Sequence, residues 1–367
     1  MLKALTSSTL FTGNEFLTGK AVIINDDRIA DVTDNDSIPS EAQIIDCKDL
    51  YISPGFIDLQ IAGAGGYLFS SAPTPEALAA ITQSILKSGT TSFQIVLPTN
   101  TTEVYRAAIR SVKDIPHPAV LGLHLEGPYI SPRRKGAHMP ELIQHPDTDT
   151  LEKLLKEADG VIKMITLAPE MCNRETVQLM KKYGVVVCAG HSNATFKEAT
   201  TGFEWGIQSV THLFNAMSQM HHRDPGLPGA VFQSKSAYAS IIVDGIHVDY
   251  NMVSIAKKQM KERLYLVSDA VEENRQGAYQ HVRQTDRFTL PDGTLSGSLL
   301  SMLLAVRNAV IHVHIPLEEA LRMASFYPAR LMKIDDRGLI KKDYRADLVV
   351  FDGEFELKMV CCNGIFY

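Results

Sequence analysis

The sequence predicts an α/β fold in which a large barrel of alternating strands and helices carries a small β lobe. Two observations predict the barrel: eight short apolar runs recur along the chain, and helix-like segments lie between them. A third predicts the lobe, because strand-like segments that do not fit this alternation occur at both chain ends. The length of 367 residues suits one large barrel with an accessory lobe.

The eight apolar runs have the length and composition of buried strands. They are IDLQIAG (57–63), TSFQIVLPT (91–99), AVLGLHLEG (119–127), VIKMITLAP (161–169), GVVVCAGHS (184–192), SVTHLFNA (209–216), ASIIVDGIH (239–247) and RLYLVSDA (263–270). Helix-like segments such as TPEALAAITQSILKSG (74–89) separate them, and several open on Thr, Asn or Asp and close on Gly, as helix caps require. Apolar strands that alternate with amphipathic helices indicate a parallel sheet covered on both faces. Eight such units predict a TIM-like (β/α)8 barrel over residues 51–337.

The two chain ends read as short strands with turns. KAVIINDDRIADV near the start alternates apolar and polar residues around an Asp-Asp turn. GLIKKDYRADLVVFDG and FELKMVCCNGIFY have the same character near the end. We expect residues 1–50 and 338–367 to build one small β-sandwich lobe, which makes it a discontinuous domain.

Charge and composition narrow the classes of function. The chain has 36 Lys and Arg against 42 Asp and Glu, so its net charge of −6 argues against a general nucleic-acid-binding surface. No signal peptide is evident, and no apolar run approaches the ~18 residues of a membrane span, so we expect no membrane partner. The five cysteines are odd in number and scattered, which argues against a disulfide framework and favours a reducing, cytoplasmic location.

Polar residues directly follow the apolar runs at several strand ends. These residues are Gln60, Glu126, His191, His212, His247 and Asp269. In a barrel, catalysis takes place at the C-terminal ends of the strands. Glu126, His191 and His212 form the carboxylate-and-imidazole set of a catalytic zinc, with a fourth position left for water. A single His at a strand end is more often a structural residue, but agreement among four strand ends favours a metal site.

The first strand predicts how many metal ions are held. Related barrels often end this strand in His-x-His, whereas this chain has Gln60 and Ala62. A second metal thus lacks its usual imidazoles, so we expect one divalent ion, with Gln60 near it and interacting through water at most. We expect Zn²⁺, with Fe²⁺, Co²⁺ and Mn²⁺ as alternatives, because carboxylate and imidazole ligands suit all four ions nearly alike.

Two further residues are candidates for catalysis. Asp269, in LVSDA, ends the last strand, where it can act as a general base; the alternative is a cap of the next helix. His138 lies in the loop RRKGAHMP, a candidate lid over the site. In the same loop, Arg133, Arg134 and Lys135 are interpreted as a solvated charge run.

The segment HHRDPGLPG (221–229) is a candidate ligand-binding loop. Its Gly and Pro residues restrict the backbone, and Arg223 is suited to forked binding of a phosphate or a carboxylate. A solvated surface loop explains the same composition equally well.

Several motifs together resemble the N-acetylglucosamine-6-phosphate deacetylases, a family within the amidohydrolase superfamily. The matching stretches are PGFIDLQIAGAGG, GTTSFQIVLPT, LGLHLEGPYISPRRKGAH, AGHSNAT, THLFNAMSQMHHRDPG, IIVDGIHVDY, LVSDA and GTLSGSLLSMLLAVRNAV. They run in the family's order and cover nearly the whole chain. Each is weak alone, but the combination is specific. Ala62 and Ser218 depart from residues common in the family, near the expected pocket.

The resemblance implies a homodimeric barrel enzyme that hydrolyses the acetamide of an amino-sugar phosphate. It implies Glu126, His191 and His212 as metal ligands, with Gln60 matching the family's single-metal form. Asp269 is then the base that becomes the acid.

The resemblance also implies residues for the substrate. His138 helps to polarise the acetyl carbonyl. Asn215, the backbone of Ala216, Arg223 and His247 hold the sugar and its 6-phosphate, and Arg223 or His247 can reach the partner's site.

Three alternatives stay open at this point. One is another amide or ring hydrolase of the superfamily, such as a dihydroorotase or an aminoacylase. The second is a deacetylase of N-acetylgalactosamine 6-phosphate, which differs only at the sugar's 4-hydroxyl. The third is a catalytically inactive relative that only binds a sugar phosphate.

Overall fold

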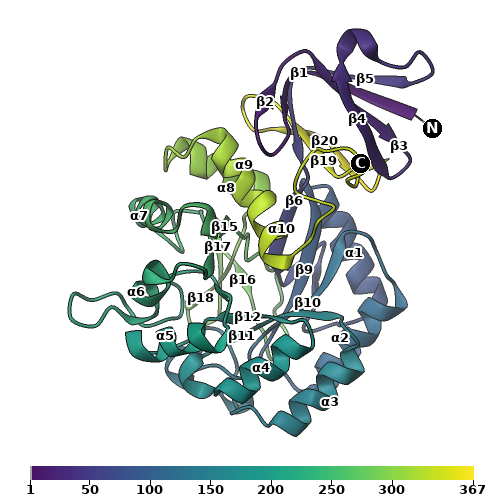
Figure 1. Cartoon of the computed structure of the whole chain (residues 1–367). Coiled ribbons are helices and arrows are strands. Elements are labelled where there is room, and N and C mark those ends of the chain that lie inside the picture. The colour runs from purple at the N-terminus through teal and green to yellow at the C-terminus, as the bar shows by residue number, and fades with distance from the viewer. Residues whose placement is uncertain (1) are drawn as a thin grey trace.

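The central barrel consists of eight parallel strands, seen in the computed structural model of the chain, which describes residues 2–367. In sheet order they are β6 (Phe56–Ile61), β9 (Thr90–Pro98), β10 (Val120–Glu126), β11 (Ile162–Leu167), β12 (Val186–Ala189), β13 (Ser209–Val210), β14 (Tyr238–Ile241) and β15 (Leu264–Leu266). Each strand lies within one of the eight predicted runs or extends it by a residue. The predicted barrel is thereby confirmed (Figure 1).

Polar contacts close the barrel between its first and last strands. Ile61 and Ala270 form a single parallel bridge, and the N–H of Ala62 donates to the carbonyl of Ala270 at 2.8 Å. The buried carboxylate of Asp58 on β6 accepts from the N–H of Ser268 at 3.3 Å, just beyond β15. The seam thus depends on a buried carboxylate as well as on the backbone.

Helices cover the outside of the barrel. They are α1 (Pro75–Leu86), α2 (Thr102–Asp114), α3 (Thr148–Ala158), α4 (Arg174–Lys182), α5 (Phe196–Trp205), α6 (Gly226–Gln233), α7 (Tyr250–Met260), α8 (Met302–Ile311), α9 (Leu317–Ala324) and α10 (Phe326–Met332). Their starts follow the expected caps: the side chains of Thr74, Thr101 and Asn173 each accept a backbone N–H of the first turn. Their apolar faces join the strands in one large core.

Both chain ends build a second sheet, which also has eight strands. It contains β1 (Leu2–Phe11), β2 (Phe16–Leu17), β3 (Lys20–Asn25), β4 (Arg28–Asp34), β5 (Gln43–Pro54), β19 (Leu348–Phe351), β20 (Leu357–Cys362) and β21 (Ile365–Phe366). β19 pairs with β5, which joins the two ends of the chain in one β lobe (Figure 1). Many of its buried side chains form a core of their own, whereas Phe11, Val349, Phe351 and Cys362 pack into the core of the barrel. The domain boundaries at 50 and 338 stay a prediction.

Two small β elements lie outside the barrel sheet. One is the hairpin of β7 (Gly63–Ala64) and β8 (Tyr67–Leu68), and the other is the three-stranded sheet of β16 (Val282–Arg283), β17 (Arg287–Thr289) and β18 (Leu295–Ser298). The N–H of Ser298 donates to the carbonyl of Asp269 at 3.1 Å, which attaches β18 to the end of the last barrel strand. The sequence analysis did not predict this three-stranded sheet.

Two expectations from composition concern the chain as a whole. Across residues 2–367, none of the helices has the length and apolar character that a membrane crossing requires. Cys47, Cys172, Cys188, Cys361 and Cys362 are all free in the described part of the chain, and four of them are buried.

Candidate active site

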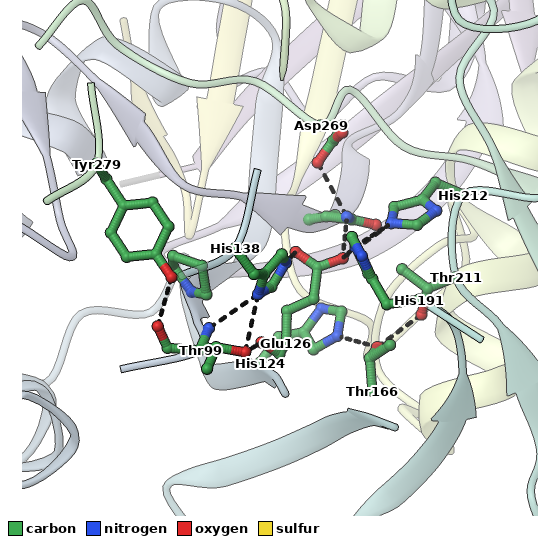
Figure 2. A network of polar contacts seen from close by, with 12 residues as sticks. Thr99, His124, Glu126, His138, Thr166, His191, Thr211, His212, Asp269 and Tyr279 are labelled. Carbon is green, nitrogen blue, oxygen red and sulfur yellow. Dashed lines mark hydrogen bonds and ion pairs between the residues drawn. The ribbon is translucent and has the colours of Figure 1, made fainter. Parts of the chain in front are cut away.

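The predicted ligand atoms meet at one point at the C-terminal end of the barrel. Oε1 of Glu126 lies 2.9 Å from Nε2 of His212 and 3.3 Å from Nε2 of His191. The two Nε2 atoms are 3.1 Å apart. All three side chains are at least nine-tenths buried, and they come from the ends of three different strands (Figure 2).

These separations fit a tetrahedral metal ion. Bonds of ~2.0–2.2 Å to nitrogen and oxygen place two ligand atoms roughly 3.4 Å apart, close to the three separations seen here. The chemistry of the atoms also fits. Nδ1 of His191 donates to the carbonyl of Arg134 at 3.0 Å, which leaves the lone pair of Nε2 for an ion. Nδ1 of His212 is buried and has no partner among residues 2–367, so it can carry the second ring's proton.

Backbone strain accompanies this convergence. His191, His212 and Asp269 have φ of 45°, 33° and 53°, in the left-handed region that residues other than Gly rarely adopt. Such conformations cost of order 1–3 kcal/mol each and cluster at functional sites. Each residue lies two or three positions after the end of a barrel strand. There, the left-handed conformation directs its side chain into the site.

A buried chain of hydrogen bonds lies under the ligands. Nδ1 of His124 lies 3.1 Å from the carbonyl of Leu59 and must donate to it, so Nε2 accepts from the hydroxyl of Thr166 at 2.7 Å. Thr166 in turn lies 2.6 Å from the hydroxyl of Thr211, the residue before His212 (Figure 2). Each group is satisfied, and the chain fixes the base of the site.

Electrostatics keep Glu126 ionised. Burial opposes the charge, but the contacts with His138, His191 and His212 outweigh it and hold the pKa of Glu126 well below its usual value. A permanently charged carboxylate is what a divalent ion requires of a ligand.

Asp269 lies beside the ligands in a site that favours a proton acceptor. Its Oδ1 accepts from Nε2 of Gln60 at 2.9 Å, and the same amide lies 3.3 Å from Oε1 of Glu126. Burial, and next the charge of Glu126, raise the pKa of Asp269 above its usual value. A raised pKa makes this carboxylate a stronger base than an ordinary Asp. Its carbonyl binds Ser298, and it caps no helix given above.

His138 presents a single proton to the site. The N–H of Thr99 donates to Nδ1 at 3.1 Å, so the proton of the neutral ring is assigned to Nε2. Nε2 lies 3.7 Å from Oε2 of Glu126. Burial lowers the pKa of His138 to about 4, so the ring is neutral near pH 7. The carbonyl of Thr99 also accepts from the hydroxyl of Tyr279 (Figure 2).

A cavity of about 510 Å³ opens above these groups. Of the predicted substrate residues, Asn215, Ala216 and His247 line it together with His138. Arg223 is exposed and is not part of its lining. Nδ1 of His247 is held 2.5 Å from Oδ2 of Asp244, which orients the ring.

Arg133, Arg134 and Lys135 belong to the loop that borders the cavity. All three line it, and Arg133 is also exposed to solvent. The guanidinium of Arg134 donates to Oδ1 of Asn193 at 3.0 Å, which joins the loop to the segment after β12. The interpretation of the three residues as a solvated charge run stays a prediction, because a position in the lining does not exclude contact with solvent.

Sequence reasoning missed other residues of the site. They are Thr99, His124, Thr166, Tyr279, His281 and Ser296. His124 was detectable, since it is two residues before Glu126 on the same face of the strand. Tyr279 and His281 lie in an irregular stretch without periodicity, which gives no signal of this kind.

Known proteins are similar to this chain over nearly its full length. The model of the Amidohydrolase family matches residues 51–365, and that of the NagA composite domain matches residues 3–49. N-acetylglucosamine-6-phosphate deacetylase of Haemophilus influenzae is 34% identical over 383 residues, which covers 99% of both chains. N-acetylgalactosamine-6-phosphate deacetylase of Shewanella sp. strain ANA-3 is 34% identical over 84% of this chain and 81% of its own. The crystal structure of N-acetylglucosamine-6-phosphate deacetylase from Pasteurella multocida superimposes with a TM-score of 0.95 at 33% identity, with all of both chains covered.

Proposed function

The chain belongs to the N-acetylglucosamine-6-phosphate deacetylase family of the amidohydrolases, and from this premise we propose that it hydrolyses N-acetylglucosamine 6-phosphate to glucosamine 6-phosphate and acetate. One observation carries the proposal. Three ligand atoms, from Glu126, His191 and His212, meet within 3.3 Å of one another, beside a carboxylate and a neutral imidazole in the same cavity.

Glu126, His191 and His212 are the residues that hold a single divalent ion, and we propose Zn²⁺ because two imidazoles and one carboxylate match its catalytic sites. Fe²⁺, Co²⁺ and Mn²⁺ accept the same ligands. When bound, such an ion polarises a carbonyl oxygen and lowers the pKa of water toward ~7. Gln60 occupies the first strand's ligand position with an amide that already donates to Asp269, which supports one ion rather than two.

Asp269 moves the proton in this mechanism. It removes a proton from the water that attacks the acetyl carbon, and its raised pKa makes it a stronger base than an ordinary Asp. The same carboxylic acid then delivers the proton to the sugar nitrogen as the C–N bond breaks. An amine leaves far more readily than an amide anion, so both halves of the reaction depend on this one group.

His138 stabilises the charge that develops on the acetyl oxygen. Its Nε2–H is the only ring proton, because Nδ1 accepts from Thr99. A neutral donor of this kind is held in place by the backbone before the reaction starts, so it costs little reorganisation.

Asn215, the N–H of Ala216 and His247 are proposed to hold the sugar and its 6-phosphate, since all three line the cavity. Arg223 lies outside this lining and is exposed, three residues after Met220, which is 47% exposed. We therefore propose a homodimer in which Arg223 of one subunit reaches the cavity of the other. His247 lines the cavity of its own chain and needs no partner.

Acetate release from the two hexosamine phosphates tests the proposal. The predicted result is a higher kcat/KM on N-acetylglucosamine 6-phosphate than on its galactose epimer. The relative from Shewanella makes the epimer the second candidate, and a reversed preference would select it. Release from neither, with tight binding of either, would instead identify a binding-only protein. We propose that the enzyme acts in the cytoplasm, which agrees with its five free cysteines.

A further inference from the structure

Strand β11 differs from its two neighbours in the barrel. β10 and β12 flank it in the sheet and end at or just before Glu126 and His191, whereas the end of β11 supplies none of the three ligand atoms. The first carboxylate after β11 is Glu170, which lies in a 3-10 turn (Pro169–Met171) and outside the lining of the cavity. Glu170 has no role in the mechanism above.

The carboxylate of Glu170 binds the turn directly after His191. Its Oε1 accepts from the N–H of Asn193 at 2.5 Å, and its Oε2 accepts from the hydroxyl of Ser192 at 2.7 Å. Ser192 is fully buried, and its Oγ accepts in turn from the N–H of Ala194 at 3.0 Å. Among residues 2–367, no Lys, Arg or His forms an ion pair with Glu170. The carboxylate is thus committed to this turn.

Further contacts lead from the turn back to the imidazole of His191. Oδ1 of Asn193 accepts from Nε of Arg134 at 3.0 Å, and the carbonyl of Arg134 accepts from Nδ1 of His191 at 3.0 Å. The N–H of Ser131 also donates to the carbonyl of His191 at 2.8 Å. Because Asn193 follows His191 in the chain, these contacts form a closed ring that holds both the backbone and the side chain of the ligand.

The turn that Glu170 holds is strained at His191. The φ of His191 is 45°, and such a conformation persists only where the surrounding structure enforces it. The two hydrogen bonds of Glu170 fall on the next two residues and fix the backbone after His191, while Ser131 and Arg134 fix its carbonyl and its ring. Without the carboxylate, the turn can relax and move Nε2 of His191 away from the other two ligand atoms.

We propose that Glu170 is a positioning residue, which holds the turn after β12 so that Nε2 of His191 faces the other two ligand atoms before an ion binds. The inference rests on the ion site of the proposed function. Residues that orient a ligand without touching the ion typically change metal affinity by roughly 10–100-fold when they are replaced. Glu170 lies outside the cavity lining, so it acts through His191 and not on the substrate.

A purely structural role is the alternative, because a carboxylate that accepts from a turn also stabilises the fold. Glu198 offers a matched comparison in the same segment. Its Oε2 accepts from the N–H and from the hydroxyl of Thr195, both at 2.8 Å, at the start of α5. Glu198 thus forms the same two kinds of hydrogen bond as Glu170. In the described part of the chain it has no hydrogen bond to residues 191–193.

The transfer of Zn²⁺ from the holoenzyme to a competing chelator separates the two roles. Glu170→Ala should bind Zn²⁺ roughly 10–100-fold more weakly than the wild type. Glu198→Ala should lower the melting temperature and leave the affinity for Zn²⁺ unchanged. Glu170→Gln keeps the size of the side chain and one acceptor oxygen, so it should recover part of the affinity that Glu170→Ala loses.

The closed ring also predicts a coupling between two of its members. Because Glu170→Ala already releases the turn, adding Asn193→Ala should weaken Zn²⁺ binding by less than Asn193→Ala does in the wild type.

Wild-type affinity for Zn²⁺ in folded Glu170→Ala would overturn the inference, as would an equal weakening in Glu198→Ala. If Glu170→Ala does not fold, Ser192→Ala decides, because it removes one of the two donors to Glu170. It should weaken Zn²⁺ binding, and wild-type affinity in it would overturn the inference. The wild type is measured first: an absence of Zn²⁺ binding rejects the ion site of the proposed function, whereas wild-type affinity in the variants rejects only the role of Glu170.

Discussion

Nε2 of Gln60 lies 2.9 Å from Oδ1 of Asp269 and 3.3 Å from Oε1 of Glu126, so one neutral amide bridges two buried carboxylates. Hydrogen bonds to an ionised carboxylate lower its pKa. Gln60→Leu should therefore raise the pKa of Asp269 further. The pH below which kcat/KM falls should therefore increase, while the metal content per chain stays the same. An unchanged profile would show that the bridge has no part in tuning the base.

Asp269→Asn should abolish proton transfer and leave the ion site intact. The substitution keeps the size of the side chain but cannot accept the proton, so kcat should fall ~10²–10⁴-fold. Steady-state acetate release, with metal counted per chain, measures both effects. Normal turnover in a metal-replete variant would reject the acid–base role.

His138→Phe should reduce kcat by ~10²–10³-fold with a smaller change in KM, because the donor acts on charge that develops during the reaction. The lowered pKa of His138, about 4, also predicts how activity depends on pH. The ring loses its neutral form only as pH falls toward that value, so the wild type should show no limb from His138 above about pH 5. A larger effect on KM than on kcat would assign His138 to ground-state binding instead.

Arg223 gives a test of the proposed dimer. Arg223→Ala should harm turnover of the phosphorylated sugar far more than that of N-acetylglucosamine itself, because the guanidinium is matched to phosphate. Lys135→Ala is the comparison, since this cation lines the cavity within its own chain.

Mixed dimers then separate action across the interface from action within one subunit. If Arg223 serves the partner's site, a dimer of one Arg223→Ala and one Asp269→Asn subunit has one intact site and one with both lesions. Mixing the two inactive variants should therefore restore activity. No recovery after confirmed subunit exchange would place Arg223 in its own chain's site or outside catalysis.

Asp58 predicts how stability depends on pH. Burial raises its pKa from 3.8 to about 7, which outweighs the hydrogen bonds from Ser268 and Gln60. A raised folded-state pKa means that the contribution of Asp58 is complete below about pH 4 and is lost as pH rises through 7. Asp58→Asn does not titrate. The free energy of unfolding of this variant, relative to that of the wild type, should therefore rise by on the order of 2–3 kcal/mol between about pH 5 and about pH 8.

Thermal melts of both proteins across this range check the sign. A stability difference that does not vary with pH would show that Asp58 keeps the same charge in the folded and unfolded chain.

The sequence located those parts of the fold and of the site in which a polar residue follows an apolar strand. Eight apolar runs located all eight barrel strands, and the polar residues after them located Glu126, His191, His212 and Asp269. This works because parallel barrel strands all end at one rim, so strand order alone brings their ends together.

The parts that sequence did not reveal depend on long-range packing. His281 and Tyr279 reach the cavity through an irregular segment whose path is set by contacts with Thr99 and Ser296. Arg134 reaches it because its carbonyl binds Nδ1 of His191, 57 positions away. Neither relation leaves a periodic signal, so composition alone does not reveal it.

The most direct test is a titration of metal-free protein with Zn²⁺ while acetate release from N-acetylglucosamine 6-phosphate is followed. The account predicts no release without metal and full activity at one equivalent per chain, with neither binding nor activity in His191→Ala. Release from metal-free protein, or saturation only at two equivalents, would contradict a single ion held by Glu126, His191 and His212.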